Sequence, residues 1–319
     1  MRSNSLPLGV DIGATRIRVC HSVSTAQGPR IRAVAVRIMS AGAASSADIE
    51  NPNYVATLVE EALTELRTKE RRCVAALGAA DALLRPFSLP RMSFVERERA
   101  ARLEAERHTE FSASDAVVRL HPSLENGVWA LGIARRSALR SRVNALRAAR
   151  LKPVAVDHEA CAFARALPAY DVIVDVGHRR TVMHVNGGPT PWTLHAARGG
   201  ADVTSSIGRE LAIDEYTAEK RKRILGAAGA GEQALNGLAA EISSSIALAR
   251  KTRPVVRVAL VGNAARLPGL SFAIEAATGA ICESPVAEIL RTDTYPDDVI
   301  RSNAPDWTLA AGLSMWKVQ

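Results

Sequence analysis

The sequence holds few of the residues that mark several common classes of protein. Only 4% of its 319 residues are aromatic, which argues against a platform that stacks the bases of single-stranded nucleic acid. Its four cysteines lie far apart and form no C-x-x-C pair, so reduced thiols are expected rather than a zinc ribbon or a disulfide framework. The seven histidines show no H-E-x-x-H or comparable spacing, so we expect no structural metal site.

Long apolar runs are also missing. Residues 255–261 form one of the longest, but Arg257 interrupts it and it falls far short of the ~20 residues that cross a bilayer. The first residues lack the apolar segment of a secretory signal, and we expect a soluble intracellular protein. The formal net charge of +8 favours an anionic partner, such as a nucleotide, a nucleic acid or the cytoplasmic leaflet of a membrane.

One short pattern occurs twice, at residues 8–15 and 172–181. In each copy an apolar run carries an aspartate, Asp11 or Asp175, before a glycine-led turn with a threonine and a second β-like run. Such a turn can present amide and hydroxyl donors to phosphate oxygens, while its carboxylate can hold a hydrated magnesium ion. One copy alone is typical of an ordinary hairpin, but the repetition favours two related lobes that hold one nucleotide between them.

The order of predicted elements supports two lobes. Hairpin strands over residues 8–38, a helix over 53–67 and a strand over 73–77 begin the first lobe, and strands from residue 172 begin the second. We place the first lobe at residues 1–170, with an insertion at about 89–155, and the second at 171–319, with a small helical subdomain at about 212–252. The last predicted helix carries Ala310, Ala311 and Gly312, which are small enough for close packing against a neighbour.

Within the insertion we expect one helix capped by Ser93 and Glu96, two short strands, and a basic helix at residues 135–150. That basic helix should bury Leu139, Val143 and Leu146. Its outer, solvated face is expected to carry Arg136, Arg140, Arg147 and Arg150, although a site for an acidic partner is the alternative.

Laid end to end, these pieces resemble the actin-like ATPase superfamily, and within it the PilM group of type IV pilus assembly proteins, relatives of the cell-division protein FtsA. The similarity covers nearly the whole chain. Beyond the two turns it rests on loose motifs in a shared order, among them Leu89-Pro90-Arg91-Met92-Ser93, Gly199-Gly200-Ala201-Asp202, Ala218-Glu219-Lys220-Arg221-Lys222 and Leu267-Pro268-Gly269. The resemblance implies an α/β, actin-like (ribonuclease H-like) two-lobed fold with an inserted α+β subdomain.

The resemblance also implies an ATP site with Mg²⁺. Asp11 and Asp175 would hold the magnesium ion through water, and Glu159 would position the attacking water. A helix-capping role on the surface for Asp157 and Glu159 is an equal alternative. Arg18 stands where the family often has a lysine directed at phosphate. The other residues that the resemblance assigns to nucleotide binding are Gly13, Ala14, Thr15, Gly177, Thr181, Gly200, Glu219, Lys222, Gly262 and Asn263.

Two positions depart from the family pattern. Asn263 replaces the second glycine of the adenosine turn, and His178-Arg179-Arg180 put bulk and charge into a turn that relatives keep small. Because both aspartates keep their glycines and threonines, nucleotide binding with slow hydrolysis at most is the favoured interpretation.

The implied function is that of a cytoplasmic assembly protein, peripheral at the inner face of the cytoplasmic membrane. It would bind the cytoplasmic tail of a bitopic PilN-like protein in a groove between the first subdomain and the insertion, and it would associate with itself. Nucleotide would set the angle between the lobes. No sequence-specific nucleic acid is expected. Two alternatives stay open, a sugar-type kinase of the same superfamily and a scaffold that has lost nucleotide binding.

Overall fold

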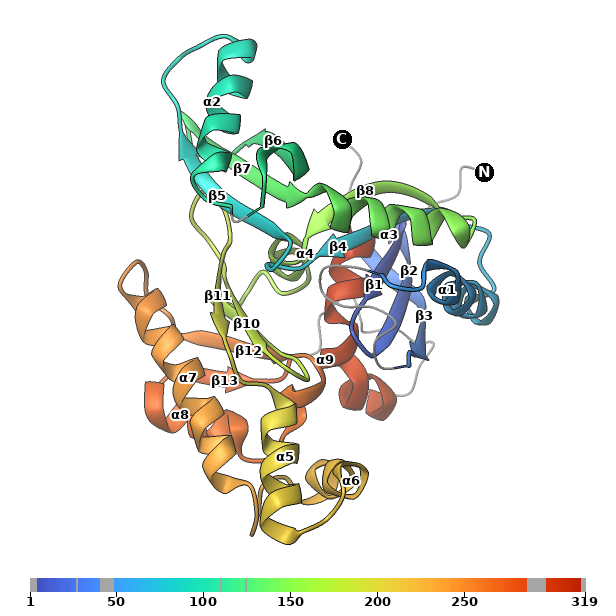
Figure 1. The fold of residues 1–319 in the computed structure, drawn as a ribbon, viewed down its shortest axis with the longest axis vertical. Helices are drawn as coiled ribbons and strands as arrows, with labels where there is room; N and C mark the ends of the chain where they lie inside the picture. The colour runs from blue at the N-terminus through green and yellow to red at the C-terminus, as the bar shows by residue number, and fades with distance from the viewer. Residues whose placement is uncertain are drawn as a thin grey trace.

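Two five-stranded sheets with the same strand order and the same pairing form the centre of the structure (Figure 1). The computed structural model describes residues 5–26, 28–40, 49–109, 111–123, 125–285 and 297–316. In spatial order, the first sheet contains β3 (Gly28–Ile38), β2 (Arg16–Thr25), β1 (Leu8–Ile12), β4 (Arg72–Leu77) and β8 (Lys152–His158). The second contains β11 (Trp192–Ala196), β10 (Thr181–Val185), β9 (Val172–Val176), β12 (Arg257–Val261) and β13 (Ile281–Glu283).

In each sheet three antiparallel strands lead into two parallel ones. Strand β1 therefore corresponds to β9, and the hairpin β1–β2 corresponds to β9–β10. This internal repeat confirms the two-lobed α/β fold, because the duplicated sequence pattern forms the same hairpin at the same place in both sheets.

The central strands are apolar on both faces because helices cover both sides of each sheet. In β9, Val172, Val174 and Val176 pack with residues of α5 (Gly200–Leu211) and α7 (Glu232–Arg250). The alternate residue Ile173 packs on the other face with α4 (Glu159–Ala166) and α9 (Asp297–Ser314). The remaining helices are α1 (Pro52–Leu66), α2 (Phe94–Glu106), η1 (Ala113–Asp115), α3 (Arg136–Ala148), α6 (Glu215–Leu225), η2 (Asn263–Arg266) and α8 (Leu270–Thr278).

Helix α9 joins the two lobes. It packs against β1, β2 and α4 and also contacts β12 of the second sheet, and Figure 1 shows it between the two sheets. Close packing at the predicted small residues is confirmed, since a Cβ added at Gly312 would lie 1.9 Å from the carbonyl oxygen of Ala162. None of the helices in the described ranges has the length and apolar character that a membrane crossing needs.

A third, three-stranded sheet of order β5-β7-β6 forms the insertion, together with the capped helix α2. Its strands are β5 (Ala82–Ser88), β6 (Ala116–Pro122) and β7 (Val128–Arg135). The sequence analysis did not predict β5. That strand carries Pro86, and it lies at the sheet edge, where a missing backbone N–H is tolerated.

The basic helix α3 and strand β8 both contribute to the first lobe. Strand β8 pairs with β4 in the first sheet, and Ala145 and Leu146 of α3 belong to the core of the first lobe. The inserted sheet itself spans residues 82–135, while the subdomain bounds of about 89–155 stay a prediction. The buried face of α3 consists of Ala138, Arg142, Ala145 and Leu146, so the expected burial of Leu139 and Val143 was wrong: both are only partly buried.

Candidate functional site

The two duplicated turns close with the same hydrogen bond. The Gly13 N–H donates to the carbonyl oxygen of Arg16 at 3.0 Å, and the Gly177 N–H donates to that of Arg180 at 3.0 Å. In each hairpin the aspartate precedes the glycine by two positions, so Asp11 and Asp175 occupy equivalent places in the two lobes.

Both aspartates line one cavity of about 530 Å³ between the lobes. Its walls come from both turns, from β2 and from the start of α4. Of the residues assigned from the sequence, the structure brings together here Asp11, Gly13, Ala14, Thr15, Arg18, Glu159, Asp175, Gly177, Gly262 and Asn263. A cavity of this size lies within the range of small-molecule sites.

Three carboxyl groups line this cavity, those of Asp11, Glu159 and Asp175. Burial raises the pKa of Asp11 above its usual value, although the charge of Arg18 acts in the opposite direction. Burial and the charge of Asp11 raise the pKa of Asp175 to about 6. Burial and the charge of Asp175 raise the pKa of Glu159 to about 7. The cavity therefore disfavours further negative charge and should gain from a cation or from cationic side chains.

Glu159 is the first residue of α4 and lines the cavity. Its Oε1 accepts a hydrogen bond from the Ala79 N–H at 3.0 Å and lies 4.0 Å from Nε2 of the buried His184. Gly78 leaves the space that this carboxylate occupies, since a Cβ there would lie 3.1 Å from Glu159 Oε2 and 3.4 Å from Arg180 Nη2. The side chain of Glu159 therefore faces the cavity rather than bulk solvent.

Asp11 is already paired with a cation. Arg18 lies directly opposite it across the β1–β2 hairpin, and its Nη1 donates to Asp11 Oδ2 at 2.9 Å. Two carboxylates on opposing lobes fit a hydrated magnesium ion, which is usually held by one or two carboxylates together with phosphate oxygens. In the part of the chain that the structure describes, no group of three His, Cys, Asp or Glu side chains could hold a metal ion by itself.

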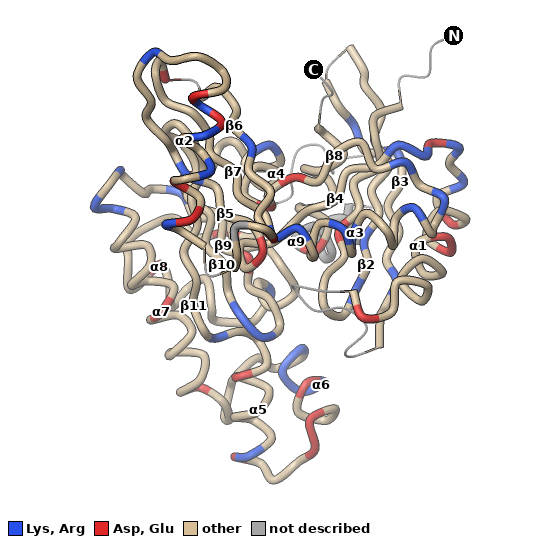
Figure 2. Tube along the Cα trace, turned by 45° about the horizontal axis from the view of Figure 1, so that its top comes forward, with Lys and Arg blue, Asp and Glu red and all other residues tan. Residues whose placement is uncertain are grey.

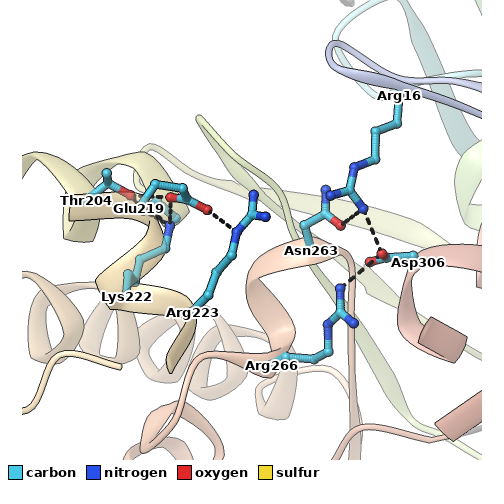
Figure 3. Close-up of polar contacts among 9 residues, drawn as sticks. Arg16, Thr204, Glu219, Lys222, Arg223, Asn263, Arg266 and Asp306 are labelled. Carbon is cyan, nitrogen blue, oxygen red and sulfur yellow. Dashed lines mark hydrogen bonds and ion pairs between the residues drawn. The ribbon is translucent and has the colours of Figure 1, made fainter. Parts of the chain in front are cut away.

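A second cavity of about 650 Å³ continues from the first and shares Thr15, Arg16, His178 and Asn263 with it. Gly200, Glu219 and Lys222, assigned from the sequence, line this second cavity, and Figure 3 shows Glu219 and Lys222 beside each other. Lys222 Nζ donates to the Gly200 carbonyl at 2.9 Å and pairs with Glu219 Oε2 at 2.6 Å. Burial acts to raise the pKa of Glu219, but hydrogen bonds from Lys222 and Thr204 lower it below its usual value.

Asn263 joins the two lobes instead of only narrowing the cavity. Arg16 of β2 donates from Nη1 to Asn263 Oδ1 and to Asp306 Oδ2, each at 3.1 Å (Figure 3). Arg266 Nη2 donates to the same Asp306 oxygen at 3.0 Å. Asp306 lies on α9 with a side chain only 3% exposed, so this bridge spans the boundary between the two cavities.

The structure corrects the role expected for Thr181. In the hairpin register Thr181 pairs with Val176, as Ile17 pairs with Ile12, so the position equivalent to Thr15 is Arg179. The Thr181 hydroxyl donates to the Arg198 carbonyl at 2.9 Å, and the residue lines neither cavity. The two turns have equal length, but the threonine comes two positions later in the second copy and therefore lies in the strand rather than in the turn.

Several cavity residues were not assigned from the sequence. Arg142 of α3 is 4% exposed and lines the first cavity, together with Arg180 and Gly78. The available signal was the position of Arg142 on the same helix face as Ala138 and Ala145. Lys and Arg residues are spread over both lobes and the insertion (Figure 2), so net charge alone does not locate the site.

Two equivalent hairpins on matching sheets, facing a shared cavity, define the actin-like ATPase fold. The family described as type IV pilus assembly protein PilM matches residues 9–318. The chain therefore belongs to the PilM family of type IV pilus assembly proteins.

Solved structures agree with this assignment. A chain of the PilM-PilN type IV pilus biogenesis complex has a TM-score of 0.86 at 26% identity, covering 97% of both chains. The ethanolamine utilization protein EutJ from Carboxydothermus hydrogenoformans scores 0.64 at 16% identity, covering 99% of this chain and 91% of its own. A MamK mutant bound to AMPPNP scores 0.51 at 12% identity over 98% of both. The last two show the shared fold. Among curated proteins no match was found.

Proposed function

We propose that this chain is a nucleotide-binding assembly protein that works at the inner face of the cytoplasmic membrane in a type IV pilus or a related secretion machine. The observation that carries the nucleotide part is the convergence of the two duplicated hairpins, which brings Asp11 and Asp175 to one cavity. In its solved form, the related MamK mutant is bound to AMPPNP, an ATP analogue. We take ATP as the ligand.

The two joined cavities suggest how ATP would lie. The phosphate chain would occupy the first cavity, between the Gly13 and Gly177 turns and among the arginines around them. The nucleoside would occupy the second cavity, beside Glu219 and Lys222. A hydrated magnesium ion entering with ATP would be held by Asp11 and Asp175, and it would supply charge neutralisation to the phosphates.

Hydrolysis would be slow at most. Glu159 would be the residue that positions water, because its carboxylate reaches the cavity from α4. Since burial raises its pKa to about 7, a large share of the molecules would carry it protonated at neutral pH and unable to act as a base. Nucleotide would therefore act mainly by setting the angle between the lobes.

The proposed partner is the cytoplasmic tail of a bitopic PilN-like membrane protein. The support is the similar solved structure, which is titled a PilM-PilN complex, at 26% identity over 97% of both chains. The tail would bind in a groove between the first lobe and the insertion, and self-association would arrange several copies beside the membrane. The formal net charge of +8 suits a place next to anionic lipid.

Replacing either aspartate tests the nucleotide part of this proposal. Asp11→Asn and Asp175→Asn keep the side-chain shape but remove the charge that would hold the magnesium ion. We expect each to weaken binding of ATP in the presence of Mg²⁺ by roughly 10-fold or more, as measured by isothermal titration calorimetry.

Asp115→Asn is the matched control, because Asp115 lies in the insertion and its contact with the Ser137 N–H can be kept by asparagine. Saturable ATP binding that is equal in all four proteins would contradict the assigned site. If wild type shows no saturable binding, the alternative of a scaffold without nucleotide is correct. ATP consumption that rises on addition of sugars would instead favour the kinase.

The partner is tested with the native membrane fraction. The tagged chain should retain a single-pass membrane protein, and a synthetic peptide of that protein's cytoplasmic tail should bind the purified chain directly. A retained protein whose cytoplasmic tail peptide does not bind would rule out this mode of attachment.

A further inference from the structure

Two basic segments of the first lobe hold most of the chain's excess positive charge. Residues 67–72 carry four cations and one acidic residue, and residues 147–152 carry three cations and no acidic residue. Each segment therefore has a formal net charge of +3, compared with +8 for the whole chain. No residue of either segment lines the two cavities of the proposed nucleotide site.

The pairing of β4 with β8 brings the two segments together. Residues 67–72 run from the end of α1 into β4, and residues 147–152 run from the end of α3 into β8. Arg72 and Lys152 are partners in the parallel register, and the Lys152 N–H donates to the Arg71 carbonyl oxygen at 2.7 Å. Figure 1 shows α1 and α3 side by side in this lobe. The segments therefore form one surface, which we name the basic patch, and its exposed cations are Arg67, Lys69, Arg71, Arg72, Arg147, Arg150 and Lys152.

Few acidic side chains compensate the basic patch. Arg72 pairs with Glu70 at 2.8 Å, and Arg150, whose side chain is 88% exposed, lies 3.7 Å from Glu60 of α1. Burial acts to raise the pKa of Glu70, but hydrogen bonds from Arg72 lower it to about 2, so Glu70 stays ionised. Within the described ranges, no ion pair is formed by the other exposed lysine and arginine ends at Arg67, Lys69, Arg71, Arg147 and Lys152. The patch therefore presents excess positive charge to its surroundings.

The basic patch lies at the far end of β4 and β8 from the nucleotide cavity. Strand β4 ends directly before the cavity residue Gly78, and β8 ends directly before Glu159. Strands of six and seven residues span about 20 Å. The cations of the patch are therefore distinct from the arginines that line the cavity, and binding at the patch leaves the nucleotide site accessible.

The composition of the basic patch favours a lipid surface over a protein or a nucleic acid. Its large apolar side chain, that of Leu151, is buried, whereas stable protein interfaces have an apolar core. It also carries no aromatic side chain on which bases could stack. The surface of a membrane rich in anionic lipid attracts clustered Lys and Arg residues through charge alone.

We infer that residues 67–72 and 147–152 together form a docking surface for anionic phospholipid headgroups, which holds the first lobe against the cytoplasmic leaflet. This inference rests on the proposed place of the chain at the membrane, and it adds a direct lipid contact to the contact made by the partner's tail. Because the attraction is electrostatic and the cations are exposed, binding should weaken as salt rises.

The test measures sedimentation of the full chain with vesicles made of equal parts of phosphatidylcholine and phosphatidylglycerol. We expect wild type to bind these mixed vesicles saturably at low salt, and to show no binding to vesicles of phosphatidylcholine alone. The patch variant is the triple substitution Lys69→Gln, Arg147→Gln and Lys152→Gln. We expect it to lose affinity for the mixed vesicles by roughly 30-fold or more, since each cation near an anionic surface contributes to binding.

The matched control is the triple substitution Arg209→Gln, Lys220→Gln and Lys251→Gln, which removes the same charge from exposed positions of the second lobe. It should bind the mixed vesicles within about 3-fold of wild type. Both triple variants should bind ATP as wild type does, because none of the six side chains lines either cavity. Unchanged ATP binding also shows that the patch variant is folded.

Equal losses in the two triple variants would overturn the inference, because net charge rather than the basic patch would then attract the membrane. Wild type that fails to bind the mixed vesicles, or that binds phosphatidylcholine alone equally well, overturns it too. So does a short DNA duplex that binds wild type more tightly than the vesicles do and is lost in the patch variant. In each of these cases the ATP and tail-peptide measurements still decide the proposed function separately.

Discussion

At the scale of single residues, Glu159 is a buried carboxyl group whose ionised form is disfavoured by burial and by neighbouring carboxylates. The charges of Asp175, Asp11 and Arg180 act on its carboxyl group, which lies 4.0 Å from Nε2 of His184. The raised pKa means that the folded protein holds this proton more tightly than the unfolded chain does. Such a group contributes stability at low pH that is lost as it ionises.

This gives a pH dependence with a definite sign. Between the ordinary glutamate pKa of 4.5 and the folded value of about 7, the folded state binds more protons, so the free energy of unfolding should fall as pH rises. Glu159→Gln removes the charge, and its Oε1 can still accept from Ala79. We expect this variant to exceed wild type in stability by roughly 1–3 kcal/mol at pH 8 and by little at pH 4.5, measured by urea denaturation. An equal difference at both pH values would contradict the assigned protonation.

The sequence located the two turns that line the cavity, but it did not identify every residue that lines it. Asp11, Gly13 and Thr15 were found from their pattern, because a short β-turn is determined largely by local residues. Thr181 was taken as the equivalent of Thr15, but the strand register shows that it lies two positions later, in the strand that follows a turn of equal length. Arg142 was missed because burial of a charged side chain depends on what packs around it.

At the scale of elements, the close packing of helix α9 against β1 and against α4 requires a glycine at each contact. A Cβ at Gly9 of β1 would lie 1.9 Å from the Ala310 carbonyl oxygen, and one at Gly312 would lie 1.9 Å from that of Ala162. In both cases the obstacle is backbone, which cannot rotate away as a side chain can. These two glycines set how closely α9 approaches β1 and α4.

We therefore expect Gly312→Ala to lower the free energy of unfolding by about 2–3 kcal/mol, because α4 and α9 must move apart. Chemical denaturation measures this. Gly132→Ala in β7 is the control: the nearest atom to its Cβ would be the Arg119 carbonyl oxygen at 3.8 Å, so a change below about 1 kcal/mol is expected. Equal effects of the two substitutions would show that the crossing is looser than the structure indicates.

Strong local patterns predicted most elements, including the capping box at Ser93 and Glu96, which is present in the structure. Strand β5 was missed because Arg85 and Pro86 interrupt its apolar pattern. It is stabilised by pairing with β7 along its whole length, from Ala82 with Ala134 to Ser88 with Val128. Such pairing joins residues about 40 to 50 positions apart, and periodicity within a short window does not detect it.

At the scale of the whole molecule, the contact between Arg16 and the Asn263–Asp306 pair is a bridge from the first lobe to the second (Figure 3). Its position between the two cavities means that a bound nucleotide would lie beside it. Because Asp306 is buried, losing a cation there leaves charge poorly compensated, although Arg266 still contacts it.

Arg16→Ala should therefore let the lobes separate more readily. We expect faster amide hydrogen exchange at both duplicated turns, by roughly 10-fold, which corresponds to about 1.4 kcal/mol. The Arg37→Ala variant, which breaks ion pairs inside one lobe, should leave exchange at the second turn unchanged. Unaltered exchange in Arg16→Ala would mean that α9, and not this bridge, holds the lobes together.

The sequence by itself determined the internal repeat, the α/β class, the two aspartates and the family, because each is written in local patterns that recur in order along the chain. The tertiary structure decided which charges meet. Arg18 against Asp11, Arg16 against Asp306 and Arg142 at the cavity wall follow from strand register and lobe packing, which bring distant residues together at distances that no local pattern specifies.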